Sequence, residues 1–298
     1  MSDRPVVLMD ASLYVFRAWH ALAPEWQDDE GWATHAVHGF THVLLQVLEQ
    51  LKPTHLAVCF DNALSTSFRN DFYPAYKANR EPPDTALTRQ FTHCQGVVRA
   101  LGVLSLCDKR YEADDLIGTL AHRARIAGKR ILVLSADKDL TQLLREGDEQ
   151  WDFGKDRRYS PKDVEEKFGV RPEQIVDWLA LAGDPIDNIP GVNGIGQQTA
   201  ARLLKHFGSL DAIYERINEI EFLKIRGAGT LKARLREQRE HAYISQRLSA
   251  IATDAPAPEL DALKLRAGDP SEIEALFKRL GFGPLMRRRA LACLSKRS

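Results

Sequence analysis

KRILVLSADKD (residues 129–139) places a continuous apolar run directly before two aspartates. PVVLMD (5–10) and THLAVCFD (54–61) repeat the arrangement earlier in the chain, each as an apolar run that ends in aspartate. An apolar run of about 4–6 residues is typical of a parallel strand that is covered on both faces. We therefore expect three buried parallel strands with acidic side chains at their carboxyl ends.

The segments between these strands have the apolar spacing of helices. Residues 35–51 and 85–101 carry apolar side chains at i, i+3 and i+4. Strands that alternate with helices predict an α/β fold, with a mostly parallel central sheet flanked by helices. After about residue 160 helical patterns follow one another, beginning with SPKDVEEKFG (160–169). We expect an α/β domain over 1–165 and a helical domain over 166–298.

Composition narrows the class of protein. The 298 residues include 41 basic and 41 acidic side chains and are 44% hydrophobic, which fits a soluble globular chain. No apolar run approaches the roughly 18–20 residues of a membrane span, and the start of the chain lacks a signal peptide. The four cysteines form no CxxC pair, so we expect reduced core thiols in a cytoplasmic protein; one structural disulfide is the alternative.

Aspartates follow all three expected strands: Asp10, Asp61, and the pair Asp137 and Asp139. Turns favour aspartate for local reasons, so each one alone is weak support for a site. In open parallel sheets, however, the ligand crevice lies just beyond the carboxyl ends of the strands. We therefore expect these four carboxylates to converge on one cleft.

YEADDLIGTLA (111–121) adds Glu112, Asp114 and Asp115 at the start of an expected helix. Acids at a helix N-terminus also complement its dipole, which is the simpler explanation for this motif alone. Taken together, however, so many carboxylates would repel one another strongly unless cations neutralised them. No histidine or cysteine accompanies them, which favours Mg²⁺ or Mn²⁺, and a pair of such ions about 4 Å apart is the usual device for attack on a phosphodiester.

LAGDPIDNIPGVNGIGQQTAARLL (181–204) supplies two further acids and then a glycine-rich turn. The acids are Asp184 and Asp187, and the glycines are Gly191, Gly194 and Gly196. Glycines that bend the chain into a helix start bring backbone N–H groups to a phosphate without reading sequence. A dinucleotide-binding motif is excluded because no strand precedes the turn and Thr199 takes the place of the third glycine. An ordinary helix–helix turn is the alternative.

FRNDFYPAYKANREPP (68–83) mixes cationic and aromatic side chains. Arg69, Lys77 and Arg80 alternate with aromatic residues that include Tyr76. Cations hold a backbone while aromatic rings stack on bases, the combination that proteins use on single strands. A basic surface helix is the simpler alternative.

Through these motifs the chain resembles the 5′-nuclease superfamily, which comprises the flap endonucleases and 5′→3′ exonucleases. The match runs from about residue 5 to residue 250, and YEADD together with GDPIDNIPGVNGIGQQTA (183–200) is its most specific part. The resemblance implies a PIN-like 5′-nuclease fold with a helical arch at about 62–90. It also implies a helix–three-turn–helix at about 176–207 that grips duplex DNA.

The resemblance also implies roles for individual residues. Asp10, Asp61, Glu112 and Asp114, with Asp115 adjacent, correspond to ligands of a first metal ion, and Asp137, Asp139, Asp184 and Asp187 to those of a second. Tyr76, Lys77 and Arg80 correspond to residues at the base of the arch that meet the scissile phosphate. Arg69, Gly191, Gly194, Gly196, Gln198 and Thr199 are the expected DNA contacts. K⁺ is expected at backbone carbonyls near Val192 and Ile195.

Two positions depart from the family pattern. The loop NALSTSFR (62–69) lacks a lysine that the family often has, and Gln198 stands where a lysine usually begins the hairpin helix. Both changes remove a phosphate-binding charge, so we expect weaker DNA affinity than is typical. Trp19, Trp26 and Trp32 lie close together in the sequence, and we expect either a wedge against a duplex end or plain core packing.

The neutral net charge does not exclude a nucleic-acid partner. Setting aside nine site acids leaves 32 acidic side chains against 41 basic ones, so the rest of the surface can attract phosphates. We expect a monomeric, two-metal-ion 5′ nuclease that acts on branched or 5′-flap DNA in replication or repair, in the bacterial cytoplasm or nucleoid. The alternatives are a junction-binding protein that cuts weakly or not at all, and a nuclease for RNA or RNA–DNA hybrids.

Overall fold

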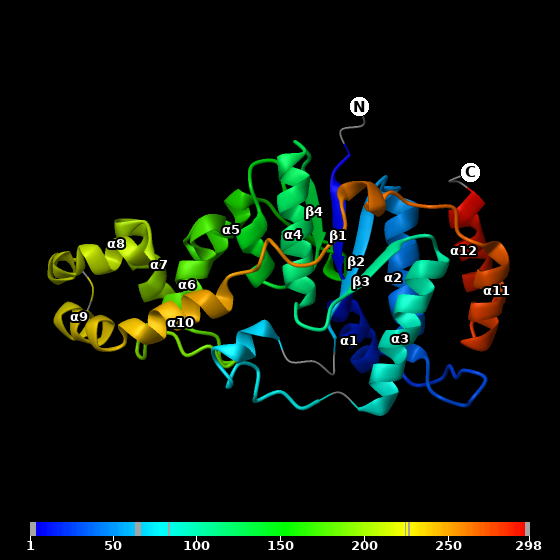
Figure 1. Cartoon of the computed structure of the whole chain (residues 1–298), viewed down its shortest axis with the longest axis horizontal. Coiled ribbons are helices and arrows are strands. Elements are labelled where there is room, and N and C mark those ends of the chain that lie inside the picture. The colour runs from blue at the N-terminus through cyan, green and yellow to red at the C-terminus, as the bar shows by residue number, and fades with distance from the viewer. Residues whose placement is uncertain (1–3, 63–66, 83, 224, 226, 296–298) are drawn as a thin grey trace.

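The computed structural model describes residues 4–62, 67–82, 84–223, 225 and 227–295. A six-stranded sheet in the order β3-β2-β1-β4-β5-β6 lies at its centre (Figure 1). The strands are β1 (Val6–Asp10), β2 (Leu56–Phe60), β3 (Leu104–Cys107), β4 (Ile131–Leu134), β5 (Glu149–Asp152) and β6 (Arg157–Tyr159). All neighbouring pairs are parallel except β5 with β6, which confirms the mostly parallel sheet.

The three expected strands are present as β1, β2 and β4, and three others were missed. β4 is shorter than the expected segment, because residues beyond Leu134 turn away and a 3-10 helix, η2 (Asp139–Leu143), follows. β3 is only partly buried, and β5 and β6 are short and largely polar, so none has a continuous apolar run. Strands of this kind lack the periodic signal on which the expectation rested.

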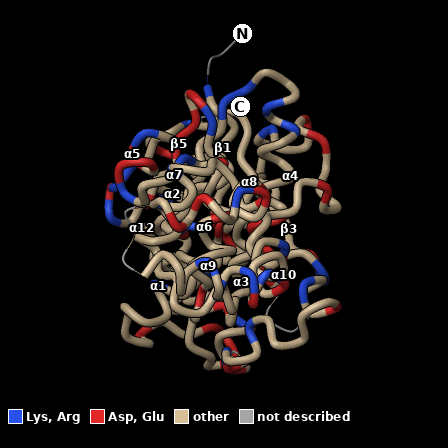
Figure 2. Tube along the Cα trace, turned by 90° about the vertical axis from the view of Figure 1, so that its left-hand side faces the viewer, with Lys and Arg blue, Asp and Glu red and all other residues tan. Residues whose placement is uncertain are grey.

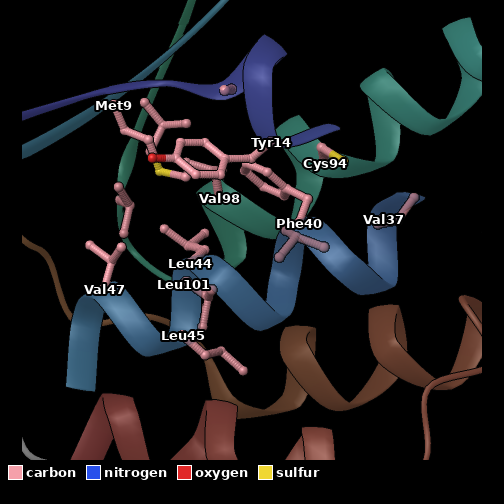
Figure 3. Close-up of a cluster of buried hydrophobic side chains, with 14 of the residues drawn as sticks. Met9, Tyr14, Val37, Phe40, Leu44, Leu45, Val47, Cys94, Val98 and Leu101 are labelled. Atoms are coloured by element: carbon pink, nitrogen blue, oxygen red, sulfur yellow. The ribbon is translucent and has the colours of Figure 1, made fainter. Parts of the chain in front are cut away.

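Helices cover both faces of the sheet. α1 (Ala11–Ala21), α2 (His35–Leu51) and α3 (Thr85–Ala100) pack on one face through a core that includes Met9, Tyr14, Phe40 and Leu44 (Figure 3). α4 (Ala113–Ile126) covers the other face through a second apolar cluster. Alternate residues of β1 enter the two clusters, as the pleat of a strand requires.

A separate group of helices forms the left-hand part of the molecule in Figure 1. Its members are α5 (Pro161–Phe168), α6 (Ile175–Ala182), α7 (Gln197–Phe207), α8 (Leu210–Glu215), α9 (Ala228–Glu237) and α10 (Arg239–Ser249). They share an apolar cluster of their own around the buried Trp178. Among the described residues, no helix has both the length and the apolar character needed to cross a membrane.

The last segment of the chain returns to the sheet. α11 (Pro270–Arg279) and α12 (Pro284–Ser295) lie at the right of Figure 1 and share the core of α2 and α3. The expected helical domain over 166–298 includes this segment because its pattern is helical, yet the segment packs on the core of the sheet domain. An amphipathic pattern shows that a helix buries one face, but it does not identify the core on which that face packs.

The segment expected to form a helical arch has little helix. Within its described part, residues 67–82 contain a single short 3-10 helix, η1 (Phe68–Asp71), and α3 begins at Thr85. Pro74 and Pro82 cannot donate a helical hydrogen bond, and Lys77 has a φ of 54°, which interrupts a right-handed helix. Residues 63–66 of the NALSTSFR loop lie outside the described part.

The tryptophans and cysteines have mostly structural positions. Trp19 stacks on His35 and Trp26 on His38, with ring centroids 4.8 and 4.1 Å apart, whereas Trp32 is 41% exposed. All four cysteines are free. Three are buried, and the exception to the expectation of core thiols is Cys107, which is exposed at the end of the edge strand β3.

A buried ion pair joins three distant parts of the chain. The Arg69 guanidinium donates two hydrogen bonds of 2.8 Å to the Asp115 carboxylate, and both side chains are almost completely buried. Its remaining N–H groups reach the carbonyl oxygens of Leu248 and Ala250, each at 2.8 Å. Arg69 therefore lies inside the protein rather than at a DNA-facing surface, and Asp115 faces Arg69 instead of a metal site.

We predict that Arg69→Met lowers the free energy of unfolding by about 3–5 kcal/mol, since it leaves a buried carboxylate without its partner. Chemical denaturation measures the change. Arg110→Met is the matched control, because Arg110 pairs with Asp71 at an exposed position and its loss should leave stability nearly unchanged. Unchanged stability of Arg69→Met together with weaker DNA binding would instead restore the expected DNA contact.

Candidate active site

The strand order places a crevice at the carboxyl ends of β1 and β4. The helices after β1 and β2 cover one face and α4 covers the other, so the connections part at this point of the sheet. A cleft of about 410 Å³ lies there. Eight of the nine expected acids line it, namely Asp10, Asp61, Glu112, Asp114, Asp137, Asp139, Asp184 and Asp187.

The ends of the strands position the first carboxylates. Asp10 is the last residue of β1 and accepts a 2.9 Å hydrogen bond from the Ser135 hydroxyl beyond β4. Asp61 follows β2 and accepts a 2.9 Å bond from the backbone N–H of Ala113 in the first turn of α4. The sheet therefore supplies Asp10, Asp61 and Asp137, and the start of α4 supplies Glu112 and Asp114.

A tight turn after α6 brings the remaining acids to the cleft. Asp184 and Ile189 exchange backbone hydrogen bonds of 2.8 and 2.9 Å, which close the turn. The turn docks on residues 75–80, because the N–H of Lys77 donates to the Asp187 carbonyl at 3.0 Å and the Asn188 amide donates to that of Ala75 at 2.7 Å. The helical group and the 67–82 segment thus meet at the site.

Burial and mutual repulsion raise the pKa values of several carboxyl groups in the cleft. Burial, and then the neighbouring Asp61 carboxylate, raise the pKa of Asp10 to about 7. Burial and Asp137 likewise raise the pKa of Asp139 to about 7. The pKa of Asp114 lies well above its ordinary value because of burial and the nearby Asp137 and Asp10. The raised pKa values of Asp10, Asp114 and Asp139 show that these buried carboxyl groups lack sufficient positive charge nearby.

Two lysines partly supply that charge. The Lys77 ammonium lies 2.7 Å from Glu112 and 3.6 Å from Asp187. Burial opposes ionisation of Glu112, but Lys77 and Arg69 hold the pKa of that carboxyl below its ordinary value. Lys138 lies 2.5 Å from Asp184 on the other side of the cleft. Each lysine therefore neutralises one part of the acidic group.

The donor chemistry fits hard divalent cations, since carboxylate oxygens line the cleft without histidine or cysteine. As the side chains stand, the described residues contain no group of three His, Cys, Asp or Glu that could hold a metal ion. Two of the eight carboxylates, Glu112 and Asp184, are held by the ammonium groups of Lys77 and Lys138. Ligation would require these carboxylates to exchange a lysine for an ion.

The three residues expected at the base of the arch lie at or beside the cleft. Lys77 and Arg80 line it, and Arg80 pairs with Asp187. Tyr76 is buried and donates a 3.0 Å hydrogen bond to the second oxygen of Glu112. Lys77 has a left-handed backbone conformation, which is strained for a residue other than glycine and must be stabilised by surrounding contacts. Such strain is often found at functional sites.

An adjoining cavity of about 430 Å³ opens beside the acidic cleft. Its lining shares Phe16, Asp61, Lys77, Arg80 and Glu112 with the cleft and adds the aromatic residues Tyr76, Phe91 and Tyr111. Sequence reasoning missed Phe16 and Lys138, both of which line the cleft. Signals existed for both, because Lys138 stands between two site aspartates and Phe16 is one helical period beyond Leu13.

The glycine-rich turn joins α6 to α7 as expected. Gly191 and Gly194 have φ values of 62° and 80°, a region that favours glycine. Gly196 is the N-cap of α7, and a side chain there would point into open space. Gln198 is exposed and Thr199 half-buried in the first turn of α7.

Two further features complete the turn. The guanidinium of Arg234 on α9 lies directly against Gly194, so a Cβ added there would collide with it. The side chains of Val192 and Ile195, the expected K⁺ positions, are buried in the helical core. The Val192 carbonyl already accepts a 2.9 Å hydrogen bond from the Ile195 N–H.

Solved structures with the same fold span most of this chain. A structure of the T5 5′-exonuclease with bound zinc aligns with a TM-score of 0.67 at 20% identity, covering 98% of this chain and 99% of that one. The catalytic core of Rad2 in complex with DNA substrate aligns with a TM-score of 0.64 at 13% identity, covering 98% and 92%. At these identities the likeness establishes the fold.

Closer sequence relatives are bacterial. DNA polymerase I of Bacillus caldotenax is 41% identical over 285 residues, and that of Pseudomonas aeruginosa is 40% identical over 285 residues. These alignments cover 94% and 95% of this chain but 32% and 31% of the polymerases, so the chain spans about a third of their length.

Family models match the chain in two consecutive parts. Residues 5–169 match the N-terminal resolvase-like domain of 5′-3′ exonuclease, and residues 170–271 match its C-terminal SAM fold. The first part holds the sheet and the strand-end aspartates, and the second holds Asp184, Asp187 and the glycine-rich turn. The chain belongs to the 5′-3′ exonuclease family.

Proposed function

We propose that this protein is a divalent-metal-dependent 5′ nuclease, a flap endonuclease or 5′→3′ exonuclease, that hydrolyses DNA phosphodiesters near single-strand/duplex junctions. The observation that carries the proposal is the cleft itself, where eight carboxylates face Lys77 and Arg80 in a chain of the 5′-3′ exonuclease family. A related fold, the T5 D15 flap endonuclease, has been crystallised with DNA and metal ions.

Mg²⁺ or Mn²⁺ is the proposed cofactor, with two ions in the cleft. Asp10, Asp61, Glu112 and Asp114 would hold the first, and Asp137, Asp139, Asp184 and Asp187 the second. Such a pair of ions, when bound, supplies a low-pKa water and neutralises charge that develops on the phosphate. Its positive charge would also favour the ionised forms of Asp10 and Asp139, whose pKa is raised first by burial and then by neighbouring carboxylates.

The cationic side chains act on the phosphate. Lys77 is anchored at the backbone by Asp187, so its ammonium can turn from Glu112 to a non-bridging phosphate oxygen without moving the chain. Tyr76 keeps its hydrogen bond to Glu112 and holds that carboxylate in place. Arg80 is half exposed beside Asp187 and orients the incoming strand.

The neighbouring surfaces fit the two parts of a junction. Unpaired nucleotides fit the adjoining cavity, where Phe16, which is 41% exposed, and Tyr111 offer aromatic faces and the buried Phe91 supports Phe16. Duplex phosphates fit the turn before α7, where Gly194, Gly196 and Thr199 let the backbone approach and K⁺ at the Val192 and Ile195 carbonyls would add charge. Gly191, an expected DNA contact, is instead buried against the Gly183 backbone, and its N–H donates to the Ser245 hydroxyl, so it shapes the turn. Arg234 beside Gly194 offsets the missing lysine at Gln198.

Figure 2 shows that basic and acidic residues are interspersed on the side of α8 and α9, so individual cations rather than a uniformly basic face meet the DNA. We infer further that the protein acts as a monomer on branched or 5′-flap DNA in the bacterial cytoplasm, in replication or repair. The bacterial DNA polymerases I that share its sequence support this setting.

The first prediction concerns metal-dependent cleavage. Purified protein with Mg²⁺ should cut labelled 5′-flap and nicked DNA near the junction, and EDTA should abolish cutting. Asp114→Asn should lower the rate by several orders of magnitude while flap binding persists, because one buried carboxylate fewer repels the phosphate. Equal cleavage by Asp114→Asn would remove the metal assignment, and a preference for RNA would assign the protein to the ribonuclease class.

The second prediction concerns Lys77. Lys77→Ala should slow single-turnover cleavage by roughly 10²-fold or more, the order expected for one preorganised electrostatic group. Flap affinity should change far less, since the charge on the phosphate grows in the transition state. Weaker binding with normal cleavage at saturation would show that Lys77 only positions the substrate.

The third prediction concerns the hairpin. Gly196→Val should weaken binding to duplex-containing substrates equally for all sequences, because its side chain would point into the space where a phosphate approaches. Gly283→Val is the matched control, since Gly283 also precedes a helix and faces open space. Fluorescence anisotropy measures both, and equal affinities of the two variants would contradict a phosphate contact at Gly196.

A further inference from the structure

Lys138 joins two acidic groups that come from different parts of the chain. Its ammonium lies 2.5 Å from Oδ2 of Asp184 and 3.4 Å from Oδ1 of Asp139. Lys138 belongs to the loop after β4, whereas Asp184 belongs to the turn after α6. The lysine therefore bridges the sheet and the helical group inside the acidic cleft.

The oxygen atoms that Lys138 contacts are those that remain available for a cation. Oδ1 of Asp184 already accepts a 2.9 Å hydrogen bond from the Ile186 N–H, so Oδ2 is the atom left for a ligand. Oδ1 of Asp139 is buried and has no hydrogen-bond partner. A single ammonium thus lies between two oxygens that would otherwise face each other without a counter-charge.

The position of Lys138 differs from that of Lys77. Lys77 contacts Glu112 of the first carboxylate group and Asp187 of the second, whereas the two carboxylates that Lys138 contacts in the described part of the chain, Asp139 and Asp184, both belong to the second. Its 2.5 Å contact is with an almost fully buried carboxylate, with side-chain exposures of 30% for Lys138 and 6% for Asp184. Ion pairs on the protein surface, which contribute little to stability, are exposed to solvent and lack this burial.

We propose that Lys138 is an internal counter-ion of the second carboxylate group, and that a divalent ion must displace it from Asp184 in order to bind. This inference rests on the proposed metal-dependent function and adds a control on metal loading. Lys138 stabilises the carboxylates while no ion is present and competes with the ion for the same oxygen atoms. The affinity for the second ion is therefore lower than the carboxylates alone would give.

Mn²⁺ binding to the full chain without DNA tests the inference. Lys138→Met keeps the apolar stem and removes the charge, so it should tighten the weaker Mn²⁺ site by about 10-fold or more, the scale of one charge at 4–6 Å. Lys138→Arg should keep the wild-type affinity. The control for net charge is Lys162→Met, because Lys162 pairs with Glu166 on the exposed surface of α5.

Thermal unfolding gives a second measurement that does not depend on activity. In EDTA, Lys138→Met should melt below the wild type, because Asp139 and Asp184 then lack a counter-charge, and Mn²⁺ should raise its melting temperature by more than it raises that of the wild type.

Three results would overturn the inference. Mn²⁺ affinity of Lys138→Met equal to or weaker than that of the wild type would exclude competition. An equal gain in Lys162→Met would show a general effect of net charge. A wild-type protein that neither binds Mn²⁺ nor cuts DNA would overturn both this inference and the proposed function. If the wild type binds Mn²⁺ and cuts DNA, either of the first two results overturns the inference about Lys138 but leaves the proposed function intact.

Discussion

The buried pair between Arg69 and Asp115 is the interaction on which the site depends. Asp115 lies in the first turn of α4, and the N-cap Glu112 and Asp114 of the same turn line the cleft. Arg69 begins the segment that carries Lys77, and it also binds the carbonyl of Leu248 near the end of α10. One guanidinium therefore sets the relative positions of the cleft acids Glu112 and Asp114, of Lys77 and of the exit from the helical group.

The buried Arg69 also differs in its role from the two lysines at the cleft, Lys77 and Lys138. Arg69 donates its N–H groups to partners within the protein, with short bonds to Asp115 and a longer one to Glu112, so it is a buried internal counter-ion. Lys77 and Lys138 each hold their acids at a cleft that is open to ligands. The ion pairs of Lys77 and Lys138 at the acidic cleft are therefore accessible to cations and phosphate. The pair between Arg69 and Asp115 is buried and fixes the surrounding structure.

Much of the fold and the site could be predicted from local patterns. Apolar runs that end in aspartate identified β1, β2 and β4, since a strand buried on both faces has a signal within its own sequence. The edge strands β3 and β6 and the short, polar strand β5 could not be found, because their stability comes from pairing with neighbours rather than from their own apolar residues. The arch was expected from resemblance, yet Pro74 and Pro82 and the backbone of Lys77 leave its described part almost without helix.

The sequence by itself determined which acids gather at the site, because the carboxyl ends of parallel strands meet at one edge and carry Asp10, Asp61 and Asp137 there. The tertiary structure alone decided the partners of the charged side chains. Arg69 and Leu248 are 179 residues apart in the chain, and Lys138 and Asp184 are 46 apart. No local pattern encodes such contacts, since burial and the distance to an opposite charge arise only when the sheet and the helical group pack together.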